Sequence, residues 1–201
     1  MEKIINKILL IMKSSGLIET DDEIIRYGLE IVIMRGVFLV LVLVIGALMN
    51  CLIESIIFAV SYSVLRMYAG GCHAESRSKC FINSVLTLII ALIGIKAAEA
   101  YGFAAAALGV LSVIAAIYIF IAAPIDTENK RLDKDEVYHY GKRARIFLII
   151  LSLLAGIMLV LRLNSIAYSV MMGMVIEAVL MLIGYLQNRK LQNPNKSFIK
   201  S

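Results

Sequence analysis

Charged residues are scarce in this 201-residue chain: Asp, Glu, Lys and Arg together make up only 17% of it. Apolar residues make up 61%, and the mean hydropathy is +0.88, whereas only about half of the residues in soluble domains are apolar. A soluble globule of this size needs far more polar surface. The composition therefore excludes a cytosolic enzyme, a disordered regulator and a secreted disulfide scaffold, and it indicates an integral membrane protein.

Cysteine and histidine are also rare, with three and two residues. Cys51, Cys72 and Cys80 are too few and too scattered for a disulfide framework, and the chain has no CxxC pair. It has neither the H-E-x-x-H motif of a zinc protease nor the G-x-S-x-G motif of a serine hydrolase. Cys72, His73 and Cys80 match no zinc-binding spacing, so the sequence predicts no metal site.

Six apolar runs are long enough to cross a bilayer, since a helix needs about twenty residues to do so. They cover approximately residues 32–50, 52–69, 82–98, 103–123, 146–163 and 165–186. The second run contains Glu54, Ser61 and Ser63, so a re-entrant hairpin is an alternative to a full span there. The sequence predicts an all-α, polytopic membrane protein with about six transmembrane helices, folded as a single domain over 1–201.

The positive charges lie between the apolar runs and form no stripe along one face, which argues against nucleic-acid binding despite a net charge of +5. Most of the 20 Lys and Arg residues fall in the N-terminal segment, the loop after the second run, the loop after Pro124 and the C-terminal tail. The hairpin around Cys51 has none, and the other two turns have Lys96 and Arg162. Because cations stay on the cytoplasmic side, this alternation favours six full spans with both termini in the cytoplasm.

The N-terminal segment, residues 1–30, has apolar residues close to helical spacing with lysines among them. This pattern predicts an amphipathic helix lying in the membrane interface, either as a simple anchor or as a docking surface for another amphipathic helix. The C-terminal tail, residues 187–201, is polar and basic.

The segment from Arg66 to Cys80 gathers the groups that could perform chemistry. Gly70-Gly71 lets the backbone leave the helix, His73 can act as a base near neutral pH, and Cys80 opens the third apolar run. A helix N-terminus and nearby cations favour a thiolate there. A base, a thiol and a positive potential are the minimum for a cysteine nucleophile.

The spacing of His73 and Cys80 limits how they could cooperate. On one continuous helix they would be about 10.5 Å apart along the axis, whereas proton transfer needs roughly 3 Å. A catalytic pair therefore requires a turn between them. The competing interpretation is that His73 is a polar interfacial residue and Cys80 a small apolar filler at the end of a span.

Two motifs stand out. The first is Arg66…Gly70-Gly71-Cys72-His73-Ala74…Cys80, and the second is Ala123-Pro124-Ile125-Asp126-Thr127-Glu128-Asn129-Lys130 at the end of the fourth run. Both resemble motifs of the accessory gene regulator B (AgrB) family. The resemblance implies a membrane cysteine endopeptidase of Gram-positive quorum sensing. Such enzymes remove the C-terminal part of a short propeptide and close the remainder into a thiolactone or lactone ring. By motif position, Cys80 would be the nucleophile and His73 its base, with Arg66, Gly70 and Gly71 as supporting positions.

The same resemblance implies where the protein is located and what its partners are. It places the chain in the bacterial plasma membrane, with the loop that carries His73 on the cytoplasmic side. Its partners would be a short amphipathic propeptide resembling AgrD and the lipid bilayer, and a homodimer is compatible with it. No cofactor is implied, because thiol–imidazole chemistry needs none.

The remaining candidate residues could orient His73 or bind substrate. Glu75, Asp126, Glu128 and Asn129 could orient the imidazole, and Lys130, Lys142 and Arg143 could receive an acidic propeptide tail. The competing interpretation of the region 124–145 is a solvated loop that obeys the positive-inside rule, which explains its charge completely.

Glu177 lies near the middle of the sixth run, where an ionised carboxylate is expensive. Such a residue marks a transport pathway, a buried partner or a protonated side chain. It supports an alternative function, a small transporter of a peptide or a proton-coupled solute. That alternative predicts loss of function on Glu177→Gln, with His73 and Cys80 dispensable.

Overall fold

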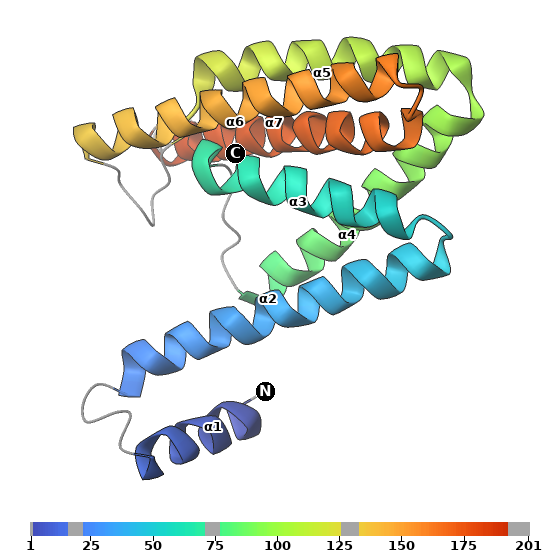
Figure 1. Ribbon diagram of the computed structural model, residues 1–201. Helices are drawn as coiled ribbons and strands as arrows, with labels where there is room; N and C mark the ends of the chain where they lie inside the picture. The colour runs from blue at the N-terminus through green and yellow to red at the C-terminus, as the bar shows by residue number, and fades with distance from the viewer. Residues whose placement is uncertain (1, 16–21, 71–76, 126–132, 193–201) are drawn as a thin grey trace, which may run out of the picture. The chain divides into compact units, whose positions relative to one another are not determined.

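The computed structural model describes residues 2–15, 22–70, 77–125 and 133–192, and this part of the chain is almost entirely helical. Its elements in chain order are α1 (Glu2–Ser14), α2 (Asp22–Leu48), α3 (Leu52–Ala69), α4 (Arg77–Ala100), α5 (Gly102–Ala122), α6 (Lys134–Val160) and α7 (Asn164–Gln192) (Figure 1). The predicted all-α class is confirmed.

The chain divides into two compact units, Met1–Leu41 and Val42–Ser201, and the boundary falls within α2. In the first unit, α1 is amphipathic: Ile5 and Leu9 are buried on one face, whereas Lys7 and Lys13 are exposed. An amphipathic N-terminal helix is therefore present, and its place in a membrane interface stays a prediction, as does the folding of 1–201 as one domain.

Among the described residues, six helices are long and apolar enough to cross a membrane, which confirms a multi-pass membrane protein. The spans are 23–48, 52–69, 81–100, 102–122, 135–160 and 164–187. Two of them begin well before the predicted apolar runs: the first starts at Glu23 rather than near 32, and the fifth at Asp135 rather than near 146. The region 124–145 is therefore not one solvated loop, because its second half is helical.

The early start of α6 has a local cause at its N-terminus. Asp133 accepts a hydrogen bond from a backbone N–H of the first turn, and the backbone N–H of Asp133 donates to Glu136 Oε2 at 3.3 Å. This reciprocal arrangement satisfies N–H groups that have no partner within the helix. The charged residues that follow are good helix formers, so the helix extends beyond the apolar run.

The second span is a complete helix, despite the hydroxyls that made a re-entrant hairpin an alternative. Ser61 Oγ donates to the carbonyl oxygens of Ile57 at 2.8 Å and Phe58 at 3.1 Å. Ser55 Oγ donates to Leu52 O at 2.7 Å. Because these hydroxyls bond to their own helix, they need no water and do not interrupt the span.

α7 is the central helix of the second unit and packs against α3, α4, α5 and α6. Half of its most apolar stretch is buried, against 28% or less for each other span. Small residues permit the close approach: a Cβ added at Gly173 would lie 2.7 Å from Ser61 Oγ and 3.2 Å from the backbone nitrogen of Tyr62. Helices in membranes commonly associate through such small residues.

Candidate functional site

The two motif segments meet at the ends of α3 and α5. The backbone N–H of Ile125 donates to the carbonyl oxygen of Ala69 at 2.9 Å, and Gly70 and Ile125 form a parallel β-bridge. Gly70 has φ +82° and ψ −153°, a conformation that only glycine adopts readily. A Cβ at this position would also collide with the carbonyl oxygen of Ile125. Gly70 therefore ends α3 and allows the two segments to approach closely.

Arg66 connects this bridge to the central helix. Its Nη1 donates to the carbonyl oxygen of Gly70 at 3.2 Å and lies 4.0 Å from Glu177 Oε2. The Arg66 side chain is 25% exposed, whereas the Glu177 side chain is fully buried. One guanidinium thus contacts both the residue that ends α3 and a carboxylate of α7.

An aromatic cluster fixes α6 against the same end of α3. Tyr68 stacks on Phe147 with ring centroids 5.1 Å apart and an interplanar angle of 9°, and Tyr140 lies 6.3 Å away at a tilt. The guanidinium carbon of Arg143 lies 5.9 Å from the centre of the Tyr68 ring, within cation–π range. The cationic end of α6 is therefore held beside α3.

α6 also contacts the end of α5. Arg145 Nε donates to Phe120 O at 3.1 Å, and its guanidinium carbon lies 5.5 Å from the centre of the Phe120 ring. A Cβ added at Gly141 would lie 3.1 Å from Pro124 Cδ. The ends of α3 and α5 and the first turns of α6 thus form one cluster, which we call the motif junction: Arg66, Tyr68, Gly70, Phe120, Ile125, Tyr140, Arg143, Arg145 and Phe147.

The structure describes five of the predicted site residues in full. Arg66, Gly70 and Arg143 belong to the motif junction, Lys142 is exposed on α6, and Glu177 is buried on α7. Cys80 is the fourth residue of α4, although its side chain is outside the described part. The other predicted residues lie outside the described residues: Gly71, His73, Glu75, Asp126, Glu128, Asn129 and Lys130.

The bounds of α3 and α4 are relevant to the predicted pair of His73 and Cys80. α3 ends at Ala69 and α4 begins at Arg77, so no described helix carries both His73 and Cys80. Cys80 lies in the first turn of α4, where the backbone N–H groups have no partner within the helix. The helix N-terminus that favours a thiolate is therefore next to Cys80.

Cys51 does not compete as an activated thiol. It is buried at the turn between α2 and α3 and forms no disulfide. Burial raises the pKa of its thiol above the ordinary value, which disfavours the nucleophilic thiolate.

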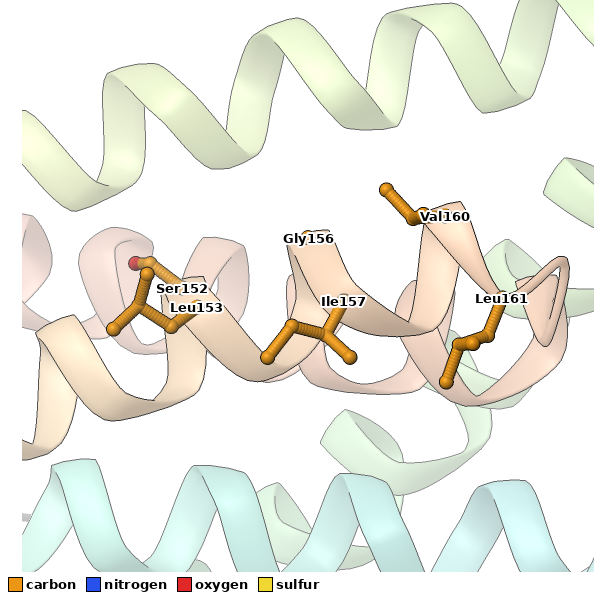
Figure 2. Close-up of a pocket in the computed structure, with 6 residues that line it drawn as sticks. All are labelled: Ser152, Leu153, Gly156, Ile157, Val160 and Leu161. Atoms are coloured by element: carbon orange, nitrogen blue, oxygen red, sulfur yellow. The ribbon is translucent and has the colours of Figure 1, made fainter.

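An apolar groove lies on one face of α6, toward its C-terminal end (Figure 2). It is lined by Ser152, Leu153, Gly156, Ile157, Val160 and Leu161. None of these six side chains is titratable, so the groove offers no base, thiol or metal ligand. Among the side chains that the structure describes, no three His, Cys, Asp or Glu residues lie together as a metal site.

Sequence reasoning missed the contacts that build the motif junction. Tyr68, Phe147 and Arg145 carry no motif, and their pairing depends on which helices are neighbours. The sequence did indicate that Glu177 needs a partner, because it lies within a span, and the structure identifies this partner as Arg66.

Comparison with known proteins agrees with the two motifs. The family model of accessory gene regulator B matches residues 1–182. An AgrB-like protein of Clostridium perfringens is 24% identical over 162 residues, which are 79% of this chain and 76% of the relative. Accessory gene regulator protein B of Staphylococcus aureus is 26% identical over 161 residues, 79% of this chain and 81% of the relative. No solved structure matches the chain. The chain belongs to the accessory gene regulator B family.

Proposed function

We propose that this protein is a membrane cysteine endopeptidase that cleaves a short propeptide through an acyl-enzyme thioester and promotes cyclisation of the acyl fragment. The observation that carries the proposal is the motif junction, where the bridge between Gly70 and Ile125 brings the two family motifs together. Cys80 in the first turn of α4 adds a thiol at a helix N-terminus.

The proposed reaction consists of two acyl transfers. The Cys80 thiolate attacks the carbonyl carbon of the scissile peptide bond, and the tetrahedral oxyanion is stabilised by N–H groups of the first turn of α4. The C–N bond then breaks, and His73, which holds the thiol proton, protonates the leaving amine. The acyl fragment remains on Cys80 as a thioester, and the C-terminal peptide departs.

Ring closure regenerates the enzyme. His73 accepts the proton of a thiol or hydroxyl within the acyl fragment, whose sulfur or oxygen attacks the thioester carbonyl. A thiolactone or lactone forms, and Cys80 leaves as the thiolate. No water is consumed, so exclusion of water favours the ring over the hydrolysed acid. In this proposal, one of four candidates orients the His73 imidazole: Glu75, Asp126, Glu128 or Asn129.

The same proposal fixes the orientation of the chain. The substrate is a short amphipathic propeptide made in the cytoplasm, so the motif junction and both termini lie on the cytoplasmic side. The cations of α6 support this orientation under the positive-inside rule.

Trapping of the acyl-enzyme tests the reaction class. Purified protein in lipid is mixed with the propeptide encoded nearest its gene and quenched in acid, and its intact mass is measured. We expect a mass increase equal to the acyl fragment, mapped to Cys80 by peptide mass and released by hydroxylamine. Cleavage with no adduct on Cys80, or an adduct elsewhere, contradicts the proposal.

Charge reversal on α6 tests how the substrate is received. Lys142 is exposed and Arg143 lies over Tyr68, so both charges are held on a rigid helix. We expect Lys142→Glu/Arg143→Glu to weaken binding of a propeptide with an acidic tail by about tenfold at low salt, with a smaller loss at high salt. Arg162→Glu, beyond the other end of α6, is a control for charge reversal elsewhere on the chain, although it reverses one charge instead of two. Unchanged binding would remove this role.

A transporter remains the alternative, favoured by the full burial of Glu177 within a span. It differs from the peptidase in one measurable respect. A transporter moves the peptide across a vesicle membrane when His73 and Cys80 are both replaced by alanine, whereas the peptidase then forms no product.

A further inference from the structure

Glu177 is in an environment that is costly for a carboxylate. The side chain is fully buried, and both carboxylate oxygens lack a hydrogen-bond donor among the described residues. Apolar neighbours along α7, Met174, Ala178 and Met181, are buried in the same core. A glutamine of the same shape would avoid the cost of burying a charge. Packing alone therefore does not explain an acidic residue at this position.

Arg66 is the cation that Glu177 faces, and Arg66 is also bonded to the backbone at the end of α3. Its Nη1 lies 4.0 Å from Glu177 Oε2 and 3.2 Å from the carbonyl oxygen of Gly70. The contact with Gly70 is a hydrogen bond, and the contact with Glu177 is an ion pair at 4.0 Å without a hydrogen bond. The Arg66 side chain thus connects the Glu177 carboxylate to the carbonyl oxygen of Gly70.

Gly70 is the last described residue before the segment that carries His73, which follows three positions later. Its conformation is set on both sides: Ile125 pairs with the backbone of residues 69–70, and Arg66 binds the carbonyl oxygen of Gly70. The backbone conformation at the end of α3 depends on these contacts.

We propose that Glu177 is a positioning residue for the peptidase: it holds Arg66 against the carbonyl oxygen of Gly70, and so fixes the backbone at the end of α3, three positions before His73 in the sequence. The inference rests on the proposed function. Glu177 touches neither the substrate nor the reacting atoms, and it acts through Arg66 and the backbone.

The packing of α3 on α7 has other supports, which separates this role from a structural one. Gly173 lies against Ser61, and the surrounding helices bury half of the most apolar stretch of α7. Arg66 is 25% exposed and can reach water when Glu177 is neutral. Glu177→Gln is therefore expected to fold, whereas Arg66→Gln leaves a buried carboxylate unpaired and is expected to lower the unfolding temperature.

A cycle of four proteins tests the inference: wild type, Glu177→Gln, Arg66→Gln and the double variant. We expect Glu177→Gln to lower kcat for propeptide cleavage by about ten- to a hundredfold, with KM within about threefold of wild type. The double variant should regain the unfolding temperature lost in Arg66→Gln and keep its low kcat, because the two residues act in one chain of contacts. Ser169→Ala, which removes another buried polar group of α7, should keep the wild-type kcat.

Alkylation of Cys80 gives a second readout without substrate. Iodoacetamide labelling at neutral pH, resolved by peptide mass from Cys51 and Cys72, reports how well His73 is placed beside the thiol. We expect slower labelling of Cys80 in Glu177→Gln, as in His73→Ala, and the wild-type rate in Ser169→Ala.

The outcomes separate failure of the inference from failure of the proposed function. If His73→Ala and Cys80→Ala lose cleavage while Glu177→Gln keeps the wild-type kcat, the positioning role is wrong and the peptidase stands. A double variant that regains both stability and kcat also overturns it. If Glu177→Gln does not fold, a wild-type kcat in the folded double variant still overturns the positioning role. Cleavage that survives loss of Cys80 overturns the proposed function.

Discussion

Cys80→Ala should abolish propeptide cleavage, with a loss of about 10⁴-fold or more in kcat, because no thioester can form without the sulfur. His73→Ala should retain the thiol and lower kcat by about 10²- to 10⁴-fold, as expected when a general base is removed. Release of the C-terminal peptide, followed by mass spectrometry of protein in lipid, measures both.

Cys72→Ala is the matched control, since it removes a thiol one residue before His73. It should cleave at close to the wild-type rate. The opposite pattern, loss in Cys72→Ala and activity in Cys80→Ala, would make Cys72 the nucleophile. Binding of the propeptide to all three variants shows that the substrate site is intact.

Gly70→Ala should disrupt the motif junction. The position has φ +82°, and a Cβ there would meet the carbonyl oxygen of Ile125. The strained backbone costs about 1–3 kcal/mol, and relief of the collision separates the two motif segments. We expect cleavage to fall by about a hundredfold, because a displacement of about 1 Å in a site has this effect.

Gly109→Ala on α5 is the control for that substitution, since nothing lies within 4 Å of the added Cβ. It should leave cleavage unchanged and leave the unfolding temperature equal to or above that of wild type, because alanine favours helix over glycine by about 1 kcal/mol. A fully active and stable Gly70→Ala would show that the pairing with Ile125 is not needed for the reaction.

The spans could be predicted because hydropathy alone reports them. Apolar runs located the six candidate spans of the described residues. The alternation of cations favoured a complete second span, which Ser61 permits by bonding to its own helix. Hydropathy placed the start of α6 too late, because charged residues there lower the mean hydropathy without disfavouring a helix. The local signal was present in Asp133 and Glu136.

The candidate site could be predicted only as two separate motifs. The glycine at position 70 indicated a special backbone conformation, and the structure gives the reason, its approach to Ile125. No local pattern indicates that residues 69–70 pair with residue 125, or that Arg66 faces Glu177 more than a hundred positions later. These contacts depend on how the helices pack. The roles of His73 and Cys80 stay predictions.

The bridge between Gly70 and Ile125 also limits how this protein can be recombined with its relatives. The two motif segments are far apart in the chain, yet they share one short stretch of paired backbone. A chimera that takes the first motif from one relative and the second from another joins backbones that did not fold against each other. We therefore expect a chimera of this chain with a relative to fold best when both segments come from the same parent, because the two segments pair as one unit.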